Sequence, residues 1–193
     1  MSGEGEGFWR PWSEWSAEAR ARLERRLEPE PGWEPLNRER STARRGRVFV
    51  PADLVDDRLC LRMFRRVEDG RVFGKVWFGP GAEGPPGHAH GGSQSAVVDH
   101  VLGAAVWSQG MRAFTGRLSY TYRTLLPLGT VATCEAWLEE VRGRKIAAKA
   151  RLFAGDVLFG ESDALFIRMR EEHLQAMARE VGGHEAASSR GRG

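Results

Sequence analysis

The chain has 193 residues, of which 41% are hydrophobic and 28% charged, and its formal net charge is +3. That balance excludes a chain that is disordered throughout, and the length is enough for one domain to bury a core of its own. Because the charge is slight and arginine is interleaved with glutamate, we expect no nucleic-acid-binding face. No stretch approaches the roughly 18–20 apolar residues of a membrane span.

The first residues and the cysteines suggest where the protein resides. The N-terminal segment is rich in glycine and glutamate and contains no apolar run, unlike a secretory signal. Cys60 and Cys134 are far apart and fall in predicted strands, as small buried side chains do in a reducing compartment. We therefore expect a cytoplasmic protein. The dispersed histidines and cysteines predict no metal site.

Residues 1–46 are predicted to form an extension before the main domain. Residues 1–11 have the composition of a disordered segment, and a helix follows over 13–28, which prolines end. Apolar side chains on one face of this helix predict that it docks on the main domain. They are Trp12, Trp15, Ala19, Leu23 and Leu27.

The main domain is predicted over residues 47–170. It begins with two strands, 59–67 and 71–78, which flank Asp69-Gly70, a dipeptide typical of hairpins. A loop rich in glycine and proline leads into one long helix over 91–109. Four strands connected by turns then follow, at 113–124, 130–142, 145–154 and 157–168.

This order predicts an α+β fold, in which an antiparallel sheet carries its helices on one face. The remaining C-terminal segment, 171–193, is predicted to hold a short helix at 171–180 and a disordered tail over 182–193.

The long helix is apolar over more than half of its circumference, so we expect it to be enclosed by the sheet and by a second subunit. The remaining strip carries three small residues and one carboxylate, Asp99. A buried carboxylate is costly without a partner, so its position indicates a function. The strip consists of Gly92, Ser95, Asp99 and Gly103.

The start of this helix, His90-Gly91-Gly92, is suited to hold negative charge. Glycines expose the first backbone amides, which have no acceptor inside the helix and lie at the positive end of its dipole. Acyl transfer requires such donors for its oxyanion. Together with Asp99 as general base or nucleophile, the helix start supplies the minimum equipment for thioester hydrolysis.

At these residues the chain resembles the hotdog-fold acyl-CoA thioesterases of the phenylacetate-pathway (PaaI-like) family. The segment 83–92 (EGPPGHAHGG) with Asp99 carries the resemblance, which continues through 120–128 (YTYRTLLPL), 141–145 (VRGRK) and 161–167 (ESDALFI). Within the family it is similar to the branch of thioesterase superfamily members four and five.

The resemblance implies a long helix wrapped by a curved sheet, in a homodimer or tetramer with active sites between subunits. It implies that Asp99 is the catalytic carboxylate, that the amide of Gly91, with Gly92, polarises the thioester carbonyl, and that His90 orients the site. It also implies that Thr115 of the partner subunit lies near the attacking water. Two departures are Gly84, where many relatives carry Asn, and His88, where an apolar residue is common.

Basic residues of the same domain are candidates for binding the phosphates of coenzyme A. They are Arg123 and the turn formed by Arg142, Arg144 and Lys145. Most basic turns are simply solvated, and this role depends on the resemblance.

The resemblance implies hydrolysis of acyl-CoA to free acid and coenzyme A. Its branch favours a medium or long fatty acyl chain, and aryl-acetyl groups stay open. No cofactor is expected, because coenzyme A is part of the substrate. Two alternatives stay open: a hotdog hydratase or dehydratase, in which a histidine pairs with an acid, and a non-catalytic acyl-CoA sensor.

Overall fold

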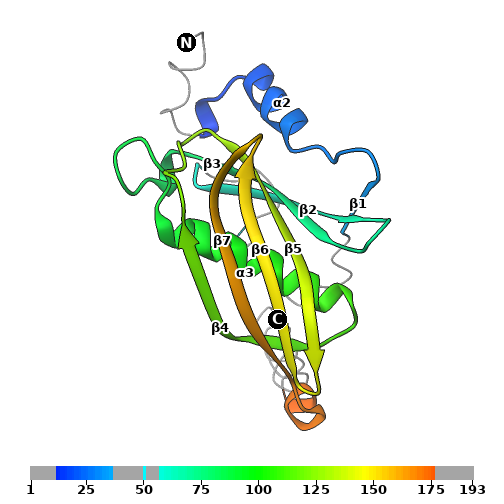
Figure 1. The fold of residues 1–193 in the computed structure, drawn as a ribbon. Helices are drawn as coiled ribbons and strands as arrows, with labels where there is room; N and C mark the ends of the chain where they lie inside the picture. The colour runs from blue at the N-terminus through cyan, green and yellow to red at the C-terminus, as the bar shows by residue number, and fades with distance from the viewer. Residues whose placement is uncertain (1–11, 37–49, 51–56, 177–193) are drawn as a thin grey trace, which may run out of the picture.

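A computed structural model describes residues 12–36, 50 and 57–176. In these segments one seven-stranded antiparallel sheet has the order β1-β2-β3-β5-β6-β7-β4. Its curved strands wrap the long helix α3 (Figure 1). The strands are β1 (Trp33–Pro35), β2 (Leu59–Arg66), β3 (Val72–Phe78), β4 (Ala113–Tyr122), β5 (Val131–Arg142), β6 (Lys145–Ala154) and β7 (Val157–Arg168). The helices are η1 (Trp12–Glu14), α2 (Ala17–Arg26), η2 (Pro80–Ala82) and α3 (Gly91–Ser108).

Helix α3 forms the centre of the core, as its broad apolar surface predicted. Valine and leucine side chains on this helix have lost all contact with solvent, because the concave face of the sheet surrounds them. The fully buried set is Val97, Val98, Val101, Leu102 and Val106.

The position of β4 differs from the prediction of four strands connected as hairpins. β4 pairs with β7 at one edge of the sheet, whereas β5 pairs with β3 on the other side. The connection between β4 and β5 therefore crosses the open end of the sheet. It passes the loop before α3, where the Ala89 amide donates to the Leu126 carbonyl and the Leu128 amide to Gly87. An edge strand has one free side, so it can pair with a strand distant in the sequence.

Helix α2 docks on the domain as predicted, but on the face of the sheet opposite α3. Leu23 and Leu27 pack with Cys60 and Trp77, which point outward from β2 and β3. Trp15 meets Trp77 edge to face, with ring centroids 5.5 Å apart. The expectation that all helices lie on one face is therefore wrong for α2, because alternate residues of β2 and β3 are apolar on both faces of the sheet.

The segment after α2 also differs from the predicted linker, because Trp33–Pro35 pairs with β2 as strand β1. Trp33 stacks on Phe73 with ring centroids 4.0 Å apart. At the other end of the domain, a helix occupies residues 171–176. The expected disorder over 1–11 and 182–193, the side chain of Trp12 and the domain boundary at residue 47 lie outside what the structure describes.

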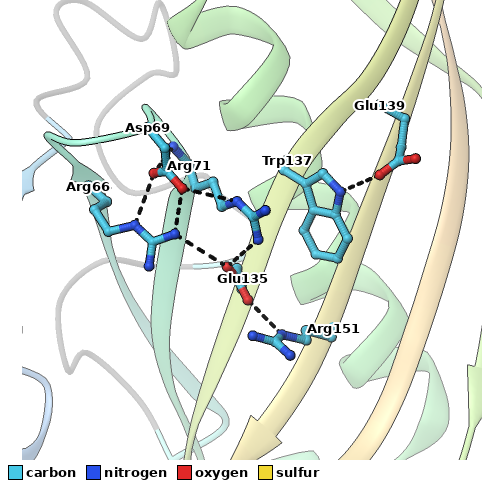
Figure 2. Close-up of polar contacts among 7 residues, drawn as sticks. All are labelled: Arg66, Asp69, Arg71, Glu135, Trp137, Glu139 and Arg151. Carbon is cyan, nitrogen blue, oxygen red and sulfur yellow. Dashed lines mark hydrogen bonds and ion pairs between the residues drawn. The ribbon is translucent and has the colours of Figure 1, made fainter.

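An ion-pair cluster ties the β2–β3 hairpin to the middle of the sheet (Figure 2). Glu135 of β5 is only 2% exposed, and its carboxylate accepts from Arg71 at 2.8 Å and from Arg151 at 2.6 Å. At the hairpin turn, hydrogen bonding from Arg66 lowers the pKa of Asp69 to about 2. A buried carboxylate is tolerated here because more than one guanidinium compensates it.

No helix in the described segments is long and apolar enough to cross a bilayer.

We predict that Glu135→Gln lowers the free energy of unfolding by about 2 kcal/mol, because it removes charge-assisted hydrogen bonds from a buried site. Denaturation in urea measures this loss. Glu139→Gln is the matched control, since Glu139 lies on the same strand but is exposed. Equal stability of the two variants would contradict a structural role for the cluster.

Candidate active site

The loop before α3 is held in place by hydrogen bonds to Ala82 and Glu83 at its beginning. The His90 amide donates to the Ala82 carbonyl at 2.7 Å, and the Gly87 amide donates to the Glu83 carboxylate at 2.8 Å. A Cβ on Gly84 would lie 2.7 Å from the Cα of His90, so the two backbones are in direct contact. A side chain at position 84 would therefore require the loop to shift.

The other departure, His88, lies in this loop, where its ring nitrogen Nδ1 is 2.8 Å from the carbonyl oxygen of Pro86. The His88 ring thus contacts the backbone of its own loop.

At the start of α3, His90 is the N-cap, and its Nδ1 accepts from the Gly92 amide at 2.9 Å. Nδ1 can accept only when it carries no proton, so the neutral ring has its proton on Nε2. The Gly92 amide is thereby occupied. The Gly91 amide has no acceptor among the described residues. Of the two predicted donors, Gly91 is the one left open for a ligand oxygen.

Asp99 lies on the half-exposed strip of α3, where the Thr115 hydroxyl donates to its Oδ1 at 2.7 Å. The resemblance implied that the threonine would come from the partner subunit. Here both side chains belong to one chain, because β4 turns back along α3 immediately after the helix ends. One carboxylate oxygen is thus engaged by Thr115. Within the described chain, no residue lies within 4 Å of a Cβ placed on Gly103, so the strip is open beside Asp99.

A β-bulge at Gly116 decides which side chains of β4 face the helix. Thr115 pairs with Phe166 and Arg117 with Leu165, so Gly116 is an extra residue in β4. In a regular strand, residues 115 and 120 would point to opposite faces. The bulge shifts the alternation by one, so that Thr115 and the two tyrosines at 120 and 122 all face α3.

The contacts that Tyr120 and Tyr122 make with α3 were not predicted from the sequence. The Tyr120 hydroxyl donates to the Gln94 carboxamide at 3.2 Å, and the Tyr122 hydroxyl donates to the Gly91 carbonyl at 2.9 Å. Their rings meet edge to face, with centroids 4.6 Å apart. Burial raises the pKa of Tyr120, so its phenol stays protonated. The sequence showed that Tyr120 and Tyr122 alternate with polar residues, but it did not show that they contact Gln94 and Gly91.

Gly91 and Asp99 are too far apart to act on one carbonyl within a single chain. They are eight residues apart in one helix, a separation of about 12 Å along its axis. An oxyanion donor and a nucleophile or base must both lie about 3 Å from the reacting group. A single chain therefore does not bring the Gly91 amide and the Asp99 carboxylate to one carbonyl.

The predicted phosphate ligands lie at opposite ends of the sheet. Arg123 follows β4 beside the start of α3 and donates to Glu161 at 2.9 Å. The β5–β6 turn lies next to the beginning of β4, where Arg144 donates to the Arg168 carbonyl at 3.1 Å. In the same turn, Arg142 donates to Glu140 at 2.6 Å. Lys145 is exposed, with no ion pair recorded among the described residues.

Residues 86–159 match the family model described as thioesterase superfamily. This match covers the helix start, Asp99, Thr115 and the strands that hold them. Over these residues the chain is similar to the thioesterase superfamily. Its fold, a long helix wrapped by an antiparallel sheet, is the hotdog fold that the resemblance implied.

Curated proteins that are similar to this chain are named as acyl-CoA thioesterases. Acyl-coenzyme A thioesterase THEM4 of Xenopus laevis is 36% identical over 94 residues, which cover 47% of this chain and 42% of the relative. Acyl-coenzyme A thioesterase THEM5 of Mus musculus is 28% identical over 96 residues, 49% of this chain and 39% of the relative. The matches thus span about two fifths of these relatives.

Solved structures agree on the fold. A crystal structure of a thioesterase superfamily protein is 32% identical with a TM-score of 0.53, over 56% of this chain and 53% of that chain. The E. coli PaaI protein of the phenylacetic acid degradation operon has a TM-score of 0.52 at 12% identity, over 58% and 80% of the two chains. A hypothetical thioesterase of Streptococcus pneumoniae, solved with coenzyme A, has the same TM-score at 17% identity, over 57% and 85%.

We predict that deletion of Gly116 lowers the free energy of unfolding by about 3 kcal/mol, because removing the bulge turns one set of inward side chains of β4 toward solvent. Thermal unfolding followed by circular dichroism measures the loss. Gly116→Ala is the control, since it preserves the number of residues and adds only a Cβ 2.9 Å from Ile167. A deletion variant more stable than the alanine variant would contradict the role of the bulge.

Proposed function

We propose that the chain is an acyl-CoA thioesterase that hydrolyses medium- or long-chain fatty acyl-CoA to free acid and coenzyme A in the cytoplasm. The observation that carries the proposal is the hydrogen bond of 2.7 Å from Thr115 to Asp99, on the same helix whose first amide, that of Gly91, has no acceptor in the described chain. The names of the curated relatives support the same substrate class.

In the proposed reaction, Asp99 either removes a proton from water or attacks the thioester carbonyl itself. Thr115 holds Oδ1, which leaves Oδ2 to face the substrate. The Gly91 amide stabilises the oxyanion that forms on the carbonyl, and such a donor is commonly worth about 3–4 kcal/mol. His90 orients this amide by capping its neighbour, and no bound cofactor is required.

A homodimer supplies the complete site in this proposal. Because the two halves lie about 12 Å apart along one helix, α3 of a second subunit must run antiparallel beside the first. Gly91 of one subunit then faces Asp99 of the other. Large apolar side chains around the strip support a covered surface, since Trp107 is 42% exposed and Phe114 is 48% exposed in the single chain.

The spacing of the acidic and hydroxyl residues adds support. Solved variants of the Streptococcus pneumoniae hypothetical thioesterase replace one aspartate and one threonine by alanine, and these positions are sixteen residues apart in that protein. Asp99 and Thr115 have the same separation.

The acyl chain is proposed to lie against Trp107, Met111 and Phe114, near the end of α3. Arg123 of one subunit and the Arg142–Lys145 turn of the other would hold the phosphates of coenzyme A, and Gly92 would contact the substrate through its backbone. Arg123 and the Arg142–Lys145 turn lie at opposite ends of one sheet. When two subunits pair in antiparallel orientation, Arg123 of one subunit comes to the same end as the turn of the other.

The hydratase alternative needs a histidine beside an acid. His90 instead accepts from the Gly92 amide through Nδ1 at 2.9 Å, and it forms no ion pair with an acid among the described residues. No specific contact favours this reaction.

We predict that Asp99→Asn reduces release of coenzyme A thiol at least about a hundredfold, because the amide can neither accept a proton nor attack. A panel of acyl-CoA substrates of increasing chain length measures both the loss and the specificity. Asp163→Asn, an exposed aspartate of β7, is the matched control and should retain full activity. Wild-type turnover by the Asp99 variant would contradict the assignment, and binding without turnover by the wild-type protein would favour the sensor alternative.

A complementation experiment tests whether the site is shared between subunits. Gly91→Pro removes the amide hydrogen at the first helical position, where proline is tolerated, and adds ring carbons beside Tyr122. His90 already has a ψ of 136°, which suits a residue before proline. Gly91→Ala, which keeps the amide, is the control for the added Cβ. We expect the proline variant to be roughly a hundredfold slower than the alanine variant.

Mixing the Asp99→Asn and Gly91→Pro proteins after reversible unfolding should then restore about a quarter of the wild-type activity. Half of the dimers formed are mixed, and each mixed dimer regains one of its two sites. No recovery in mixed dimers, identified by tagging the two chains differently, would contradict a shared site.

A further inference from the structure

The peptide unit between Gly91 and Gly92 is held at both of its ends. Its carbonyl accepts from the Tyr122 hydroxyl at 2.9 Å, and its amide donates to His90 at 2.9 Å. Two successive glycines give the chain more rotational freedom here than any other pair of residues would. The two hydrogen bonds remove that freedom, because a peptide unit is planar and cannot turn while both ends are bound.

The preceding peptide unit, which carries the Gly91 amide, is held by hydrogen bonds as well. The His90 carbonyl is bound by the Ser93 amide at 3.0 Å and the Ser93 hydroxyl at 2.7 Å. Gly91 thus lies between two anchored peptide planes, and its own N–H has a defined direction out of the helix start. Electrostatic stabilisation of an oxyanion depends on such a donor being oriented before the reaction begins.

Tyr122 and Gly91 fit each other in shape. A Cβ on Gly91 would lie 2.9–3.0 Å from the hydroxyl and ring of Tyr122, so any larger residue would displace the tyrosine. Tyr120 packs edge to face against the Tyr122 ring and limits its movement on the other side. The bulge at Gly116 is what turns both rings toward α3.

We propose that Tyr122 is a positioning residue for thioester hydrolysis, which acts through the Gly91 carbonyl to aim the Gly91 amide at the substrate. This inference rests on the proposed function. Tyr122 does not touch the reacting atoms and exchanges no proton during the reaction. Its hydroxyl limits the orientations of the oxyanion donor.

The test is Tyr122→Phe, which removes the hydroxyl and preserves the ring. We expect kcat to fall about five- to tenfold with KM within about twofold, as for the loss of one neutral hydrogen bond that acts on the transition state. Tyr120→Phe is the matched control, because it removes the same group from the same strand. It should lower Tm, since Gln94 loses its donor, and leave kcat unchanged.

A double-variant cycle separates positioning from general weakening of the fold. In the Gly91→Pro background the amide is absent, so Tyr122→Phe should cause little further loss of kcat. The Gly91→Ala protein, which keeps the amide and adds a Cβ at the same place, measures how much kcat is lost through displacement of Tyr122 alone. The same five- to tenfold loss in that background would overturn the inference, as would a Tyr122→Phe protein with wild-type kcat. If the wild-type protein turns over no acyl-CoA, the proposed function fails first, and this outcome is distinct from an active enzyme insensitive to Tyr122.

Discussion

One extra residue in an edge strand determines which side chains reach the central helix. Without the bulge at Gly116, either Thr115 or Tyr122 would point away from α3, because residues of a strand alternate between its two faces. With the bulge, one end of β4 contacts Asp99 and the other contacts the helix start. The contacts of β4 with the start and the middle of α3 therefore depend on the pairing register of β4 with β7, which large apolar residues such as Phe166 keep in place.

The same helix then serves two purposes that a single chain cannot combine. Its N-terminus offers a rigidly held amide, and its middle offers a carboxylate about 12 Å away. In the proposed homodimer, a second copy in antiparallel orientation would remove this separation, because a two-fold axis places the start of one helix beside the middle of the other. The half-exposed strip of small residues on α3 permits such a close approach.

Much of this could be predicted from the sequence, and the gaps have physical causes. The breadth of the apolar surface on α3 predicted its enclosure, and the glycines after His90 predicted an exposed amide. The edge position of β4 was missed because hairpin signals report only neighbouring strands, whereas β4 pairs with a strand about forty residues later. The visible alternation put Thr115 and Tyr120 on opposite faces. An isolated glycine inside a strand is a known sign of a bulge, so Gly116 was the available clue.

Helix α2 has a consequence for higher assembly. It covers the outer face of β2 and β3 through Leu23, Leu27 and Trp77, and thereby removes that half of the sheet from contact with other copies. In the described part of the chain, the outer face over β5, β6 and β7 carries lysine and arginine beside aspartate and glutamate. The short N-terminal helix thus limits how a second copy could approach the outer face of the described sheet, because over β2 and β3 that copy would meet α2 and not the strands.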